Sequence, residues 1–166
     1  MLRLFGPLQS RAVVTLYEGL LFLHILFAVV WVGGGAIIQL YALRALATND
    51  PARIAGFAKD TEWVATRTFT PAGLLLVASG VWLVEEGNWG FNHFWIVFGL
   101  AVYAASFLSG AFFLGPESGR IGKLVDEQGV AHPDVQARIK RIFAISRVEL
   151  VLLIAVVFDM TIKPSF

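Results

Sequence analysis

Residues Gly19–Leu43 read GLLFLHILFAVVWVGGGAIIQLYAL, and this stretch decides the fold class. It contains no charged residue, and its two strongly polar side chains are His24 and Gln39. A helix rises about 1.5 Å per residue, so the stretch can cross the roughly 30 Å hydrocarbon core of a bilayer. It is much longer than the apolar core of a cleaved signal peptide. The sequence therefore predicts a retained membrane span over about residues 17–43.

The composition of the chain is typical of a protein that lies in a lipid bilayer. Hydrophobic residues make up 57% of the 166 residues, and charged residues make up 15%. A soluble domain of this size needs more polar surface, whereas a bilayer removes that need. The net charge of +1 gives no basis for binding nucleic acid, and the lack of cysteine excludes disulfides and thiolate-ligated metals. We expect a single transmembrane domain over residues 1–166.

Three further apolar stretches predict three more spans, so the expected fold is an all-α, four-helix membrane bundle. The four predicted spans cover about residues 17–43, 64–84, 92–114 and 142–162. Pro71 would lie inside the second span, where neighbouring groups can satisfy the freed carbonyl. Gly115-Pro116 would end the third span.

The two long polar connections, residues 45–67 and 116–147, mix charged and apolar residues. This pattern predicts amphipathic helical segments, the first of them on the membrane surface. Asp50-Pro51 favours a helix start, because Asp50 can cap the helix and proline suits its first position.

Lysine and arginine are distributed unevenly between the two sides of this bundle. The connection between the first two spans holds four of them, the connection between the last two holds six, and the other side holds three. Positive residues favour the cytoplasmic side of a membrane. We therefore expect both long connections in the cytoplasm and both termini outside.

His24 is an ionisable residue within the first span. Placing such a group in a bilayer costs free energy, so a functional role is the default hypothesis. His24, Trp31 and Gly35 recur at helical spacing with Ala28 and Ile38, so they share one helix face. The small residues on this face leave room for another helix or a flat cofactor. Imidazole ligates haem iron and other metals, so His24 is a candidate axial ligand of a b-type haem or a metal ligand. Trp31 and Gly35 would shape the pocket.

Two other residues bear on the role of His24. His93, at the start of the third span on the same side, is either a second ligand or an ordinary interfacial histidine. Asp159, near the end of the fourth span, is a candidate hydrogen-bond partner for His24. If His24 makes this hydrogen bond to Asp159, it joins two helices and binds no cofactor.

Glu149 begins the fourth span on the side where Arg44 and Arg67 lie. The simplest prediction is an ion pair with one of these arginines that joins spans at the cytoplasmic face. A lone buried carboxyl group would instead hold its proton and could relay it.

Short motifs in the spans carry a family resemblance. They are Leu23-His24-Ile25 through Trp31-Val32-Gly33-Gly34, Thr70-Pro71-Ala72 with Gly80-Val81-Trp82-Leu83, and Arg147-Val148-Glu149 leading to Ile162-Lys163-Pro164. On these motifs the chain resembles an uncharacterised family of predicted bacterial integral membrane proteins. That family is distantly similar to the CopD-type copper-resistance proteins and the HemJ-type protoporphyrinogen oxidases. The resemblance implies a haem-binding bundle in the bacterial plasma membrane, with His24 as the ligand to haem b.

Trp95 is a departure from the HemJ-type pattern, which has a lysine at this position early in the third span. The difference argues against protoporphyrinogen oxidation, although His93 could supply an alternative ligand. Copper handling favours clusters of Met, Cys or His, and the chain has two Met and no Cys. Two functions follow from the sequence. The first is a haem-binding redox protein, and the second is a non-enzymatic module: a transport or copper-related accessory, a subunit of a complex, or a homo-oligomer.

Overall fold

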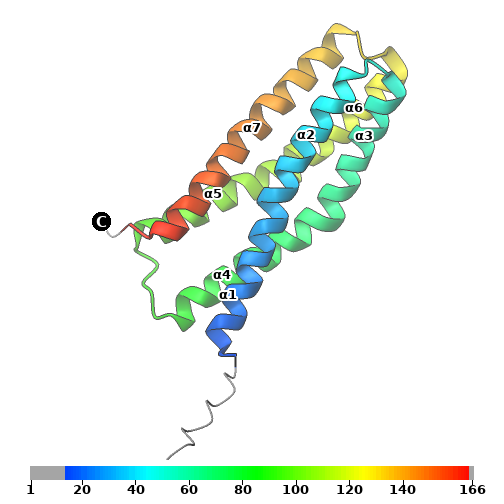
Figure 1. The fold of residues 1–166 in the computed structure, drawn as a ribbon. Helices are drawn as coiled ribbons and strands as arrows, with labels where there is room; N and C mark the ends of the chain where they lie inside the picture. The colour runs from blue at the N-terminus through cyan, green and yellow to red at the C-terminus, as the bar shows by residue number, and fades with distance from the viewer. Residues whose placement is uncertain (1–13, 165–166) are drawn as a thin grey trace, which may run out of the picture.

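The computed structural model describes residues 14–164, and this part of the chain is helical with no strand. The predicted all-α fold is confirmed. The helices line up into four long rods that run side by side (Figure 1). Rod 1 consists of α1 (Leu16–Ala28), the π-helical segment η1 (Val29–Gly33) and α2 (Gly34–Ala47).

Rods 2 and 3 are built in the same way, and rod 4 is a single helix. Rod 2 consists of α3 (Pro51–Val64), the π-helical η2 (Ala65–Phe69) and α4 (Thr70–Glu86). Rod 3 consists of α5 (Phe94–Ser109), the π-helical η3 (Gly110–Leu114) and α6 (Gly115–Gln128). Rod 4 is the single helix α7 (Pro133–Ile162). The end with residues 48–50 and 129–132 is called the polar end below, and the end with residues 87–93 the tryptophan end.

Local sequence signals explain where the rods begin and end. Thr15 and Glu18 form a capping box at the start of rod 1. Asp50 accepts a hydrogen bond from the Ala52 amide (3.0 Å) and Pro51 takes the first helical position, which confirms the predicted start of rod 2. Gly129 ends rod 3 with φ of 82°, a positive value that glycine adopts more readily than other residues.

The helix of rod 3 continues through Gly115-Pro116, so a helix end at this point is wrong, and the end of the third membrane span there stays a prediction. Proline lacks an amide hydrogen and clashes with the carbonyl four residues earlier in an α-helix. Pro116 and Pro71 are each the second residue after a π-helical segment. Such a segment shifts the hydrogen-bond ladder by one residue, and this lets the helix change direction without ending.

The helices extend further into the polar connections than expected. Rod 1 continues past Arg44 to Ala47, and α3 and α6 are continuous with the apolar helices α4 and α5. Their helical character is confirmed, but they extend the bundle beyond the predicted spans and are not separate surface helices. The reason is that α3 and α6 each have an apolar side that the other covers.

A compact core at the polar end joins α3, α6 and α7. Its buried residues are Ile54, Ala55, Ala58, Ile121, Val125, Val135 and Ile139. Small residues bring α3 and α6 close together, and the Ser118 hydroxyl donates to the Ala58 carbonyl at 2.9 Å. Burial of these side chains from water fixes this half of the bundle.

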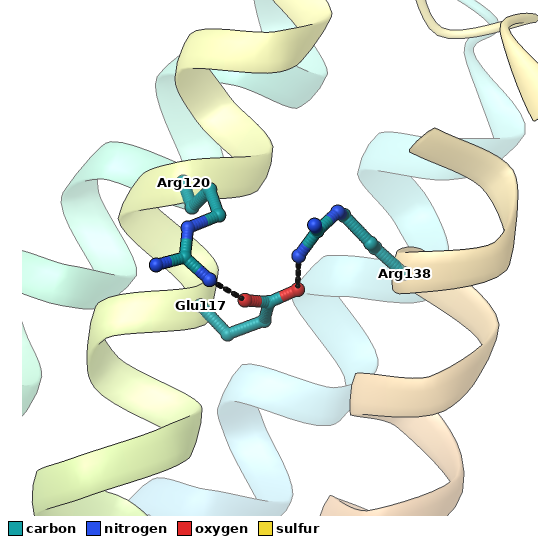
Figure 2. Close-up of polar contacts among 3 residues, drawn as sticks. All are labelled: Glu117, Arg120 and Arg138. Atoms are coloured by element: carbon teal, nitrogen blue, oxygen red, sulfur yellow. Dashed lines mark hydrogen bonds and ion pairs between the residues drawn. The ribbon is translucent and has the colours of Figure 1, made fainter. Parts of the chain in front are cut away.

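Glu117 links rods 3 and 4 at this end (Figure 2). Its carboxylate is 8% exposed and accepts hydrogen bonds from Arg120 (3.1 Å) and Arg138 (2.6 Å). Arg138 belongs to α7, whereas Glu117 and Arg120 belong to α6. Both carboxylate oxygens therefore have a charged donor, which is what a buried carboxylate requires.

The rods separate into two pairs toward the tryptophan end. There α1 packs on α4 and α5 packs on α7, and the pairs diverge (Figure 1). Trp89 and Trp95 meet edge to face at 5.4 Å, and Lys163 lies over both rings. These contacts tie the end of α7 to the start of rod 3.

Three of the described rods, Leu16–Ala47, Pro51–Glu86 and Phe94–Gln128, are long and apolar enough to cross a membrane. Rod 4 carries Arg147, Glu149 and Asp159 in its apolar half and does not meet that criterion. Large apolar side chains face outward on all sides, such as Leu40 (66% exposed), Phe112 (78%) and Phe158 (67%). An exposed apolar surface of this extent is typical of contact with lipid.

Candidate functional site

Trp31, in η1, lies at the centre of the bundle. Its ring packs directly on Gly73 of α4, where no Cβ would fit, and contacts the rings of Tyr103 (5.4 Å) and Phe107 (6.0 Å) of α5. The Tyr103 hydroxyl in turn donates to the Gly73 carbonyl at 3.0 Å. Trp31 thus contacts both rod 2 and rod 3 and fixes their spacing from rod 1.

A cavity of about 340 Å³ extends from this point toward the polar end, between all four rods. Each π-helical segment contributes to its wall, with Trp31 from η1, Phe69 from η2 and Leu114 from η3. The lining of rod 1 runs from Trp31 to Leu46, which is roughly 22 Å along the helix axis at 1.5 Å per residue. π-helical segments are frequent at functional sites, and here three of them surround one cavity.

The cavity wall is mainly apolar, with a few polar side chains. The polar and charged residues are Gln39, Thr61, Glu62, Thr66, Thr70, Ser106, Ser118, Ser146 and Glu149. Within the described residues, no lysine, arginine or histidine lines the cavity. Small-molecule sites in proteins have this composition, in which apolar walls give volume and a few polar groups orient the ligand.

Two buried oxygen atoms in this wall have no hydrogen-bond partner. The Gln39 side-chain amide donates from Nε2 to Ser146 Oγ at 2.7 Å, which leaves Gln39 Oε1 unpaired. Glu149 Oε1 is unpaired as well. Ser146 and Glu149 are three residues apart on α7 and so lie on one face, which brings the two unpaired oxygens to the same region of the cavity.

The ion pair predicted between Glu149 and Arg44 or Arg67 is not formed, so that prediction is wrong. Among the described residues, the ion pairs involve other carboxylates. Arg44 is exposed, and Arg67 lies over the Trp63 ring at 5.0 Å. Both arginines therefore lie on the outside of the bundle while Glu149 faces the cavity.

His24 lies between α1 and α4 and does not line the cavity. Its Nδ1 atom is 3.0 Å from the Leu76 carbonyl oxygen and 3.4 Å from the Ser79 hydroxyl. The ring rests on Gly80, where an ideal Cβ would be 2.8 Å from His24 Cε1. The hydrogen bond of His24 is thus made to the backbone of α4, and the partner suggested by the sequence, Asp159, is on the other helix pair.

His93 precedes α5 at the tryptophan end, where its ring meets that of Trp89 at 6.2 Å. The four residues singled out in the sequence are therefore divided among three places. Trp31 and Gly35 line the cavity, His24 is at the α1–α4 contact, and His93 is at the tryptophan end. No group of three or more His, Cys, Asp or Glu placed to hold a metal occurs among the described residues.

The long apolar rods, their exposed apolar surface and the cavity between them define a helical integral membrane protein that crosses the bilayer more than once. The chain belongs to the family described as "Predicted integral membrane protein (DUF2269)", whose model matches residues 18–164. This confirms the membrane family predicted from the sequence, whereas the distant similarity to CopD-type and HemJ-type proteins stays a prediction. No curated protein and no solved structure matches the chain.

Proposed function

We propose that this protein is a non-enzymatic membrane module that binds a small, largely apolar molecule in the cavity between its four rods. The observation that carries this proposal is the pair of unpaired oxygens, Gln39 Oε1 and Glu149 Oε1, in the wall of a cavity of about 340 Å³. Ligand pockets in proteins have volumes of about 300–1,000 Å³ and are largely apolar. In this role the protein would serve as a transport accessory or as a subunit of a larger or homo-oligomeric assembly.

The unpaired oxygens favour a ligand-binding role over a purely structural one. A buried polar atom without a partner costs about 1–3 kcal/mol of folding free energy. The Glu117 carboxylate shows the alternative, since both of its oxygens are paired with arginines. A ligand that donates hydrogen bonds to Gln39 and Glu149 would recover the free energy lost at these sites.

In this proposal rod 4 is a fourth membrane span. Its half from about residue 148 exposes large apolar side chains, including Val151 (66% exposed) and Ile154 (54%). Ten of the thirteen lysine and arginine residues lie toward the polar end, and this excess favours an orientation with that end in the bacterial cytoplasm and both termini outside the plasma membrane.

Calorimetric titration of the detergent-purified protein with 2-phenylethanol, a small molecule with an aromatic body and one hydroxyl donor, tests the binding proposal. Gly35 and Gly110 line the cavity, and a Cβ on either meets no atom within 4 Å. Gly35→Leu and Gly110→Leu therefore fill the cavity, whereas Gly33→Leu, where a Cβ is equally free, adds the same side chain elsewhere. We expect binding to the wild type and to Gly33→Leu, and its loss in both filling variants. Equal heats for all four proteins would overturn the proposal.

A second candidate function is binding of haem b through His24, and one observation favours it. His24 Nδ1 is held by the Leu76 carbonyl, and metal-ligating histidines are commonly held by a backbone carbonyl at one nitrogen while the other binds the metal. Nε2 would then be the iron ligand at the α1–α4 contact, and the iron would supply one-electron redox chemistry. Trp31 and Gly35 line the separate central cavity, so they would not form the pocket of this haem.

An absorption spectrum tests the haem candidate. Protein expressed with added haem precursor should show a Soret band and sharp b-type peaks after reduction. The band should be lost in His24→Ala and kept in His132→Ala, whose histidine caps α7 at the polar end. His93→Ala tests the second ligand. A colourless wild-type protein would eliminate this candidate and leave the cavity proposal untouched.

A further inference from the structure

We infer that the central cavity selects a protonated amine with an apolar body. This inference rests on the proposed function, because it names the chemical class of the ligand that the cavity would bind. It follows from the charge of the lining, from the kind of hydrogen-bonding atom left unpaired, and from the aromatic side chains in the cavity wall.

The charge of the cavity wall has one sign. Two carboxylates, those of Glu62 and Glu149, line the cavity, and the described lining holds no basic residue. Three arginines that neighbour lining residues in the sequence lie over aromatic rings: Arg67 over Trp63 at 5.0 Å, Arg141 over Phe113 at 5.1 Å and Arg147 over Phe143 at 5.4 Å. Charge–charge interactions are strong in a region of low dielectric constant, so this cavity attracts cations and repels carboxylate or phosphate ligands.

The unpaired atoms require a donor. Because Gln39 Nε2 is already used by Ser146, the free atom Gln39 Oε1 can only accept a hydrogen bond. A bound cation favours the ionised form of the neighbouring Glu149 carboxyl group, and Glu149 Oε1 can then only accept a hydrogen bond. An ammonium group has three N–H donors and a positive charge, so it can serve both oxygens at once and neutralise the carboxylate. A hydroxyl group has a single donor and no charge.

The apolar part of the ligand would lie among aromatic rings. Trp31, Phe69 and Phe107 all line the cavity, and each comes from a different rod. Aromatic faces attract ammonium groups as well as apolar surface. A bare metal ion is a poorer match, because the described residues place no group of three ligating side chains together.

A ligand series separates charge from shape. The probes 2-phenylethylammonium, 2-phenylethanol and propylbenzene have nearly the same size and differ in the end group: a charged donor, a neutral donor and a methyl group. Each is titrated calorimetrically into the wild type, Glu149→Gln and the matched control Glu85→Gln, whose residue is exposed and outside the cavity. We expect the ammonium to bind about tenfold or more tightly than the alcohol, because a hydrogen bond to a charged group is the stronger one.

The two variants show whether the preference for the ammonium depends on the charge of Glu149. Glu149→Gln should remove the preference for the ammonium over the alcohol, and Glu85→Gln should behave as the wild type. If the ammonium and the alcohol bind the wild type equally, or if Glu149→Gln keeps the preference, the inference is wrong and the proposed function stands. If no probe binds in a way that Gly35→Leu abolishes, the proposed function fails together with the inference.

Discussion

The indole ring of Trp31 lies so close to Gly73 that an ideal Cβ on this glycine would be 1.8 Å from Trp31 Cζ3. Real Cβ atoms do not approach other atoms to that distance, and the neighbouring Tyr103 ring limits how far Trp31 can move. The contact between these two residues sets the distance between rods 1 and 2 and closes one end of the cavity.

The first prediction concerns Gly73→Ala. Overpacking a well-packed site costs about 1–3 kcal/mol, and we expect a loss of that size in the free energy of unfolding. Gly33→Ala is the matched control, since a Cβ at Gly33 meets no atom within 4 Å and alanine favours the helix by about 1 kcal/mol. Denaturant unfolding in detergent, followed by circular dichroism, measures both. Equal stability of the two variants would show that the Trp31 contact is not tight.

The second prediction concerns the link between rods 3 and 4. Glu117→Gln removes the charge that Arg120 and Arg138 share (Figure 2). The arginines are 62% and 39% exposed, so water screens part of the interaction, and we expect a loss of about 1–2 kcal/mol. Glu127→Gln, an exposed position on the same helix, should change stability by less than about 0.5 kcal/mol. The same unfolding measurement applies, and the prediction fails if Glu117→Gln matches this control.

The third prediction concerns topology. A reporter that is active only outside the cytoplasm, fused after Phe166, should be active, because ten of thirteen basic residues lie toward the polar end. The same reporter inserted after Gly129, in the connection between rods 3 and 4, should be inactive. The reverse pattern would invert the proposed orientation, and activity at both positions would mean that rod 4 does not cross the membrane.

Much of the helical fold follows from the sequence, because apolar length and capping signals are local properties. The stretch around His24 predicts rod 1, and Asp50-Pro51 predicts the start of rod 2. The continuation of rod 3 through Pro116 does not follow, because proline ends most helices and only the preceding π-helical segment allows it to continue here.

The candidate site was less predictable, because it depends on which side chains face one another. Gln39 and Glu149 were visible as polar residues in apolar stretches, but their shared cavity depends on the register of rods 1 and 4. The sequence predicts an arginine as the partner of Glu149, since opposite charges near one membrane face commonly pair. Arg67 lies on Trp63 instead, and this leaves the carboxylate facing the cavity.

Thiol protection measures whether the cavity between the rods takes up a ligand. The chain has no cysteine, so a single introduced cysteine is the only thiol. Ser106 and Ser79 are both 6% exposed, but only Ser106 lines the cavity, so Ser79→Cys is the control for Ser106→Cys. The rate of modification by a small cationic thiol reagent is measured with and without 2-phenylethylammonium. We predict that the ligand slows modification of Ser106→Cys and leaves Ser79→Cys unchanged. Modification of Ser106→Cys at the same rate with and without the ligand would contradict the account.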